Sequence, residues 1–153
     1  DKDHVVQALS SLGDVRFHRV RLRHGKPIAV AELEDAIAIA IPGKPVGAHV
    51  VASLVARPFF TGQAELPTIT ATATHDVGLP TTNFTYAIPM SVSDGEAVPL
   101  GHVASALSVY EETFDPSVLS SSTRATRADG IVITDSALSA GESVEIVPFP
   151  SLE

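Results

Sequence analysis

The clearest indication of chemistry in this sequence is a local reversal of charge. Residues 16–26 (RFHRVRLRHGK) contain five cationic side chains and no acid, whereas the whole chain of 153 residues has a net charge of −8. Cations this close together repel one another unless an anion or facing carboxylates lie among them. The run therefore favours two interpretations about equally: a site for an oxyanion or phosphate, or an exposed surface paired with acids from elsewhere in the fold.

A second candidate is the turn Pro42-Gly43-Lys44-Pro45, which lies between an apolar run and a helical pattern. The free N–H groups and the positive dipole end of a helix N-terminus attract anions. Gly43 would let a ligand approach the backbone, and Lys44 would add a charge. Without a partner motif, an ordinary strand-to-helix turn is the better interpretation. The segment lacks the spaced glycines and the Lys-Ser/Thr pair of a phosphate-binding P-loop.

Metal and nucleophile chemistry has little support from the sequence. The six histidines show neither HxxxH nor HExxH spacing, and the chain has no cysteine, which excludes disulfides, cysteine–zinc sites and cysteine nucleophiles. Asp1 and Asp3 could hold a divalent cation, but acids at the start of a helix also complement its dipole. The excess of acids disfavours nucleic acid as a partner. We expect no membrane span and no signal peptide, and hence a cytoplasmic protein.

The cationic run must be positioned by the first sixty residues. Apolar spacing predicts an amphipathic helix over 5–12, which a glycine ends, and then a strand over 15–23. Residues at every second position of a strand share a face. The alternation therefore predicts that Arg19, Arg21 and Arg23 lie side by side.

Three further elements complete this part of the chain. Strands are predicted over 28–33 and 36–41. The second (AIAIAI) is apolar throughout, which is typical of a strand covered on both faces in a layered α/β sheet. The apolar segment 46–57 predicts a buried helix, with Pro45 in its first turn and Pro58 at its end. This order of elements is that of part of an α/β domain.

The remainder of the chain has a different character. Residues 61–66 predict a linker, after which β-branched residues and turn signals dominate. Short strands separated by turns predict a small antiparallel barrel or sandwich, and only 120–128 has a helical pattern. The strands are expected over residues 68–74, 82–89, 97–102, 106–112, 130–134 and 143–147. The predicted units are 1–60, a partial α/β domain, 61–66, the linker, and 67–153, the barrel.

Together these segments resemble the MoeA/gephyrin family, the molybdopterin molybdenumtransferases. That family carries a stretch of the form F-x-K-V-x-x-K-P-G-K-P and, later, L-P-G-N-P-V-S before a helix. The matching positions here are Phe17, Arg19, Val20, Arg23, Gly25-Lys26-Pro27 and Ile41-Pro42-Gly43-Lys44-Pro45-Val46. The far end, with ADGIVIT and GESVEIVPF, resembles the family's C-terminal domain. The fold implied is the C-terminal part of a molybdopterin-binding-type α/β domain followed by a small antiparallel β-barrel domain.

The resemblance also implies an activity. Members of the family bind adenylylated molybdopterin, hydrolyse its nucleotide bond and insert molybdate, and they require a divalent cation, here expected to be Mg²⁺. By position, the resemblance implies four catalytic residues: Asp3, Arg19, Arg23 and Lys26. It assigns Arg23 and Lys26 to the oxyanion, Arg19 to phosphate or pterin, and Asp3 to the metal or to polar support. It assigns substrate binding to a further set of residues: Gly25, Pro27, Pro42, Gly43, Lys44, Pro45 and Ser120.

The sequence also departs from the family pattern. Arginine stands for lysine at positions 19 and 23, Lys44 for the usual asparagine and Gly47 for the usual serine, so one hydroxyl ligand is missing. We expect the chain to be the C-terminal portion of a longer, homodimeric enzyme and to be inactive alone. Two alternatives remain open: a non-catalytic module that binds an oxyanion or pterin, and a scaffold that binds a protein partner.

Overall fold

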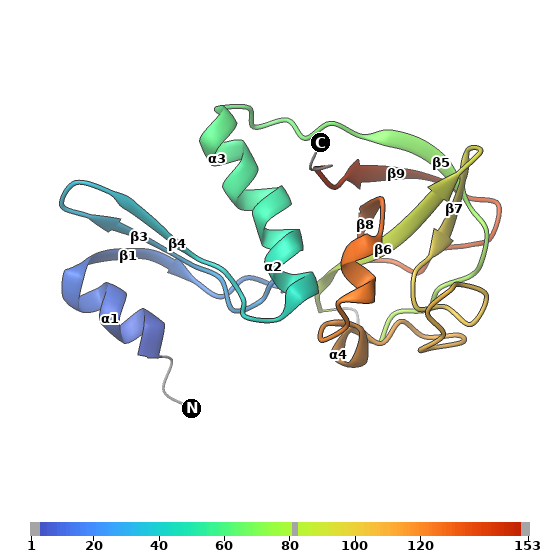
Figure 1. The fold of residues 1–153 in the computed structure, drawn as a ribbon, viewed down its shortest axis with the longest axis horizontal. Coiled ribbons are helices and arrows are strands. Elements are labelled where there is room, and N and C mark those ends of the chain that lie inside the picture. The colour runs from blue at the N-terminus through green and yellow to red at the C-terminus, as the bar shows by residue number, and fades with distance from the viewer. Residues whose placement is uncertain (1–3, 81–82, 151–153) are drawn as a thin grey trace.

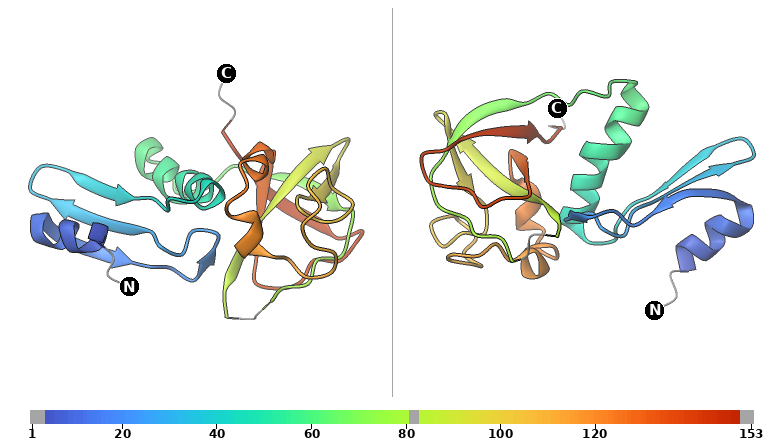
Figure 2. Two further views of the ribbon diagram at one scale, coloured as in Figure 1. Left: turned by 60° about the horizontal axis from the view of Figure 1, so that its bottom comes forward. Right: turned by 180° about the vertical axis from the view of Figure 1, so that it is seen from behind.

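The computed structural model describes residues 4–80 and 83–150. A small sheet with one helix and a larger β-barrel lie on opposite sides of a longer helical segment (Figures 1 and 2). Within the described residues, no helix is long and apolar enough to cross a membrane.

The first part is a three-stranded antiparallel sheet in the order β1-β3-β4, with α1 packed against β1 and β3. Its elements are α1 (His4–Leu12), β1 (Gly13–His18), β3 (Ala29–Leu33) and β4 (Ile37–Ala40). The predicted helix over 5–12 is confirmed, although none of the side chains of α1 is fully buried. The small sheet therefore adds little to the main core.

The predicted continuous strand over 15–23 is wrong. The chain leaves the sheet at Arg19, whose φ of 66° lies in the left-handed region. Two hydrogen bonds hold this excursion, from the Arg19 N–H to the Ile28 carbonyl (2.9 Å) and from the Val20 N–H to the Lys26 carbonyl (3.1 Å). The strand alternation that was expected to align the arginines is interrupted here, and Arg23 reaches a different sheet.

The strand over 36–41 is present, but the expectation that both its faces are covered is wrong. The exposed fractions of Ile37 and Ile41 are 42% and 51%. β4 is an edge strand, because it pairs only with β3 in the three-stranded sheet. The helix α1 packs mainly against β1 and β3, so β4 at the edge of the sheet has little cover over its apolar side chains.

The predicted helix begins at Pro45 as expected but continues past Pro58. It consists of α2 (Pro45–Val51), a π-helical turn (Ala52–Ala56) and α3 (Arg57–Thr61). The π turn shifts the hydrogen-bond pattern, and Pro58 then lies in the first turn of α3, where its missing N–H costs little. Gly62 ends the helix in the left-handed conformation, with a φ of 68°.

The predicted barrel is confirmed, but its pairing is mixed rather than purely antiparallel. Strands β6, β7, β5, β9 and β8 pair in that order, and β8 pairs with β6 to close the ring. β5 and β7 run parallel, whereas the other barrel pairs are antiparallel. The strands are β5 (Ile69–Ala73), β6 (Thr85–Ser93), β7 (Glu96–Pro99), β8 (Gly130–Thr134) and β9 (Ser143–Pro148).

The strand predicted over 106–112 is wrong. The Gly101 carbonyl accepts hydrogen bonds from the N–H groups of both Val109 and Tyr110, and Ser105 Oγ accepts from those of Gly101 and Leu107. These local bonds replace sheet pairing and fold the segment into a loop. The helical pattern over 120–128 is realised only in part, as a 3₁₀ helix (Arg124–Arg127) that follows α4 (Pro116–Leu119).

The main core lies inside the barrel and extends to the long helix. Its fully buried side chains include Tyr86, Ile88 and Ile131, and α2 contributes Val46 and Val50 to the same cluster. Burial of such apolar surface is worth roughly 1.5–3 kcal/mol for each large side chain. The core therefore fixes α2, and the loop that precedes it, against the barrel.

Candidate functional site

A cavity of about 390 Å³ lies where the two parts of the molecule meet. Three segments form it: the short strand β2 (Leu22–Arg23) with the turn after it, the loop between β4 and α2, and α4 of the barrel part. The lining residues are Leu22, Arg23, His24, Gly25, Lys26, Pro27, Pro42, Gly43, Lys44, Gly47, Pro116, Ser117 and Ser120. Three of these are cations and none is an acid, so the cavity favours an anionic ligand.

The barrel positions the first cation. β2 (Leu22–Arg23) pairs in parallel with β6, with Arg23 opposite Tyr86. The guanidinium carbon of Arg23 lies 4.5 Å from the centroid of the Phe84 ring, and Nζ of Lys26 lies 5.5 Å from it. Both distances are within the range of cation–π attraction. The half-buried Phe84 ring thus holds two cations of the cavity.

The turn that carries Lys26 depends on a glycine. Gly25 has a φ of 126°, a conformation that side chains rarely adopt. A β-carbon at this position would also lie 3.2 Å from Val51 Cγ2 of α2. Gly25 therefore lets the turn approach the helix closely and places Lys26 at the mouth of the cavity.

The third cation links the loop to the barrel part. Lys44 Nζ donates a hydrogen bond to Ser120 Oγ at 3.2 Å, and the Ser120 hydroxyl donates to the Ser117 carbonyl at 2.9 Å. Asp115 caps α4 by accepting hydrogen bonds from the N–H groups of Ser117 (2.9 Å) and Val118 (3.3 Å). Hydrogen bonding to Ser117 lowers the pKa of Asp115, so its carboxylate is ionised at neutral pH.

A buried histidine lies among these cations. The side chain of His24 is only 5% exposed and meets the ring of Phe114 edge-on, with the ring centroids 5.8 Å apart. Burial, together with the nearby charges of Lys44 and Arg23, lowers the pKa of His24 from 6.5 to about 4. The imidazole is therefore neutral at physiological pH. Nε2 of His24 and Nε of Arg23 are enclosed without a hydrogen-bond partner among the described residues.

Gly47 lies at the start of α2 and lines the cavity. A β-carbon there would lie 3.2 Å from Cβ of the buried Pro42 and 3.8 Å from the Gly25 nitrogen. The tight contact with Pro42 gives a steric reason for glycine at this position. The serine usual in the family pattern would have to displace the proline ring.

The structure brings most of the sequence-predicted site residues together. Those that line the cavity are Arg23, Gly25, Lys26, Pro27, Pro42, Gly43, Lys44 and Ser120. Pro45 begins α2 and does not line the cavity. Arg19 is exposed and also lies outside the lining, because the chain turns away at that residue. Asp3 lies outside the described residues. The roles assigned to all of these residues remain predictions.

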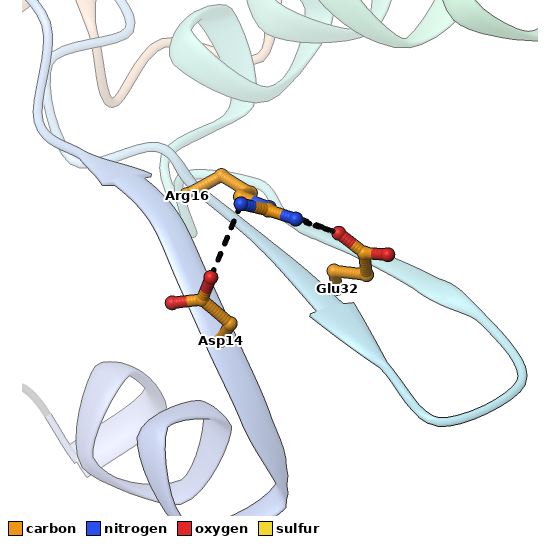
Figure 3. Close-up of polar contacts among 3 residues, drawn as sticks. All are labelled: Asp14, Arg16 and Glu32. Atoms are coloured by element: carbon orange, nitrogen blue, oxygen red, sulfur yellow. Dashed lines mark hydrogen bonds and ion pairs between the residues drawn. The ribbon is translucent and has the colours of Figure 1, made fainter.

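For Arg16, the second interpretation of the cationic run is correct: its side chain is exposed and paired with acids. Its guanidinium lies between Asp14 and Glu32 on the exposed surface of the small sheet, as Figure 3 shows. Nη1 is 3.2 Å from Asp14 Oδ2, and Nε donates to Glu32 Oε2 at 2.9 Å. The run is therefore divided: Arg16 is neutralised by acids, whereas Arg23 and Lys26 line the cavity.

Sequence reasoning missed several residues of the cavity wall. They are Leu22, His24, Pro116 and Ser117, together with Phe84 behind the cations. A capping pattern, Asp115 followed by a proline and a serine, could have indicated the short helix α4. Nothing local indicates that α4 packs against a loop about seventy residues earlier.

The described residues contain no ready-made cluster of metal ligands. Among residues 4–80 and 83–150, no group of three or more histidine, aspartate or glutamate side chains is arranged to hold a metal ion. The lining of the cavity contains no carboxylate, the ligand that Mg²⁺ favours. The expected role of Mg²⁺ therefore rests on Asp3 alone and stays a prediction.

Fold and site together define a class: a small α/β part joined to a closed β-barrel, with a cationic cavity at the junction. Solved structures share this fold. A molybdopterin biosynthesis MoeA protein from Pyrococcus horikoshii superposes with a TM-score of 0.75 at 22% identity, over 98% of this chain and 36% of that one. A molybdenum cofactor biosynthesis protein from Pyrococcus furiosus gives 0.68 at 14%, over 97% and 55%. A second MoeA structure, from Pyrococcus horikoshii OT3, gives 0.63 at 13%, over 97% and 40%.

These likenesses confirm the fold that the sequence motifs implied, that of a portion of a MoeA-type chain. The chain spans between 36% and 55% of the length of the structures it matches. No protein-family profile and no curated protein matches the sequence. Activity, substrates and partners therefore belong to the proposals that follow.

Proposed function

We propose that the cavity binds the anionic part of a pterin or nucleotide ligand, and that the chain supplies this site to a molybdopterin molybdenumtransferase. The observation that carries the proposal is the lining itself, in which Arg23, Lys26 and Lys44 converge without an acid. At neutral pH these groups form charge-assisted hydrogen bonds to phosphate or molybdate oxygens, which are stronger than hydrogen bonds between neutral groups.

The three cations have different tasks in this proposal. The planar guanidinium of Arg23 presents paired N–H donors to two oxygens of one anion, while Phe84 fixes its orientation. Lys26 and Lys44 add point charges from two different segments of the lining. Because Lys44 also donates to Ser120, its ammonium is held in place before a ligand arrives. Such preorganisation lowers the entropic cost of binding.

The size and polarity of the cavity support an organic ligand rather than a free oxyanion alone. A tetrahedral oxyanion would fill only a small part of 390 Å³. Leu22, Pro27, Pro42 and Pro116 supply apolar wall for a ring system or a sugar. Adenylylated molybdopterin and molybdate, the substrates that the family resemblance implies, have the required combination of anionic and planar parts.

Isothermal titration calorimetry with tungstate tests the proposal. Arg23→Ala should weaken tungstate binding at least about tenfold, equivalent to ~1.4 kcal/mol. Arg21→Ala is the matched control, because Arg21 belongs to the same run, is exposed and does not line the cavity. Equal affinity of the unaltered protein and the Arg23→Ala variant would overturn the assignment.

A non-catalytic binding module is the second candidate. Two observations favour it: Gly47 lacks the hydroxyl that the family pattern places there, and the steric contact with Pro42 opposes its replacement. Turnover distinguishes the two functions. Conversion of adenylylated molybdopterin in the presence of molybdate by the full-length protein would support the transferase, whereas binding without conversion would support the module.

A further inference from the structure

His24 has the features of a ligand contact but no role in the site as described so far. Its side chain is 95% buried, yet it lines the cavity between the Arg23 and Lys26 positions. Burial of a polar side chain costs free energy unless hydrogen bonds compensate. Nε2 has no partner among the described residues, so the protein alone does not compensate that cost.

We infer that His24 contacts the anion in the cavity as a neutral hydrogen-bond donor and thereby helps to select the ligand. This inference rests on the proposed function, since it needs an anion in the cavity. The nearest oxygens of a bound phosphate or molybdate would accept from the imidazole N–H. For Nε2, which is enclosed in the structure, this contact requires the ring to turn towards the cavity when the anion binds. A hydrogen bond from a neutral donor orients the bound anion without adding a fourth positive charge to those of Arg23, Lys26 and Lys44.

The surroundings of the ring explain why it acts as a neutral group. Two cations act on the ring: Arg23 beside it on its own turn, and Lys44 from the loop before α2. Lys26 lines the same cavity, and Asp115, next to Phe114, accepts hydrogen bonds within its own helix. Phe114 covers another side of the ring. Repulsion by the cations and exclusion of water both oppose an imidazolium.

A neutral donor predicts a particular pattern among variants. His24→Gln keeps an uncharged N–H donor, whereas His24→Phe keeps a ring of similar size without any donor. Titration calorimetry with tungstate should give an affinity about fivefold or more weaker for His24→Phe, and within about twofold of the unaltered protein for His24→Gln. Tungstate affinity of the unaltered protein should be constant between about pH 6.5 and 8.

A measurement on the unaltered protein tests the same contact without relying on the folding of a variant. Nitrogen-15 NMR spectra of the histidine rings should show a change at His24 on addition of tungstate. His49, which stacks on Phe149 with the ring centroids 3.8 Å apart and does not line the cavity, is the internal control and should not change.

The outcomes separate this inference from the proposed function. If tungstate binds, and binding depends on Arg23 but not on His24, the role of His24 is overturned while the proposed function stands. Equal losses for His24→Gln and His24→Phe, or unmoved His24 ring signals in the bound state, also overturn it. Absence of tungstate binding to the unaltered protein overturns both.

Discussion

Lys44 and Ser120 lie 76 positions apart in the sequence, yet Lys44 Nζ donates a hydrogen bond to Ser120 Oγ at 3.2 Å. This contact joins the loop before α2 to the end of α4. The cavity therefore exists only when the first part of the chain is packed against the barrel. Its three cations come from two segments, and only folding brings Lys44 close to Arg23 and Lys26.

The Lys44–Ser120 contact should affect ligand binding through the position of the ammonium. Ser120→Ala should weaken tungstate binding about twofold to fivefold in the unaltered background, but should have almost no effect when Lys44 is already replaced by methionine. Titration calorimetry on the two single variants and the double variant measures this difference. The same fold-change for Ser120→Ala in both backgrounds would contradict a positioning role.

Phe84 should contribute to binding although it lies behind the cavity. Phe84→Leu removes the ring that lies 4.5 Å from the guanidinium carbon of Arg23. Cation–π contacts of this kind are worth about 0.5–1 kcal/mol, so tungstate affinity should fall roughly twofold to fivefold. Phe84→Tyr keeps the ring and is the control. An affinity for Phe84→Leu equal to that of the unaltered protein would show that Arg23 is held by other contacts.

The glycine at position 47 should be required for stability. Gly47→Ser places a β-carbon 3.2 Å from Cβ of the buried Pro42, so the proline ring would have to shift by a few tenths of an ångström. We expect this crowding to exceed the helix-propensity gain of up to about 0.5 kcal/mol and to lower the melting temperature. Gly43→Ser is the matched control, because no atom lies within 4 Å of a β-carbon there. A Gly47→Ser protein as stable as the control would refute the steric explanation.

His24 should make stability depend on pH. Burial lowers its pKa from 6.5 to about 4, so between these values the unfolded chain binds more protons than the folded one. The free energy of unfolding should therefore fall as the pH drops from 6.5 towards 4, by at most roughly 3 kcal/mol from this residue. Urea unfolding across this range measures the slope. His24→Gln should flatten the curve, and an unchanged slope would mean that the buried imidazole is not responsible.

The cations of the cavity could be predicted from the sequence because charge and spacing are local properties. Arg23, Lys26 and Lys44 stand in two short segments whose composition differs sharply from the rest of the acidic chain. The predicted alignment of Arg19 with Arg23 failed for a non-local reason. Alternation assumes an unbroken strand, and the strand ends where the Arg19 N–H bonds the Ile28 carbonyl.

The wall of the cavity could not be predicted, because it depends on contacts between distant segments. His24 is buried partly by Phe114, which follows it by ninety positions in the sequence. The parallel pairing of β5 with β7 has the same cause, since a strand's own pattern does not specify its neighbour or their relative direction. Packing between distant segments decides these features, whereas the sequence pattern predicted several of the individual elements, such as the helix α1 and the strands β8 and β9.

Tungsten anomalous scattering from crystals soaked in tungstate tests the central claim most directly. We expect a tungsten peak inside the cavity, within hydrogen-bond reach of Arg23 and close to Lys26 and Lys44. Crystals of the Arg23→Ala variant should show a much weaker peak at the same place, and those of Arg21→Ala an unchanged one. Tungsten bound elsewhere, with the cavity empty under saturating conditions, would contradict the account.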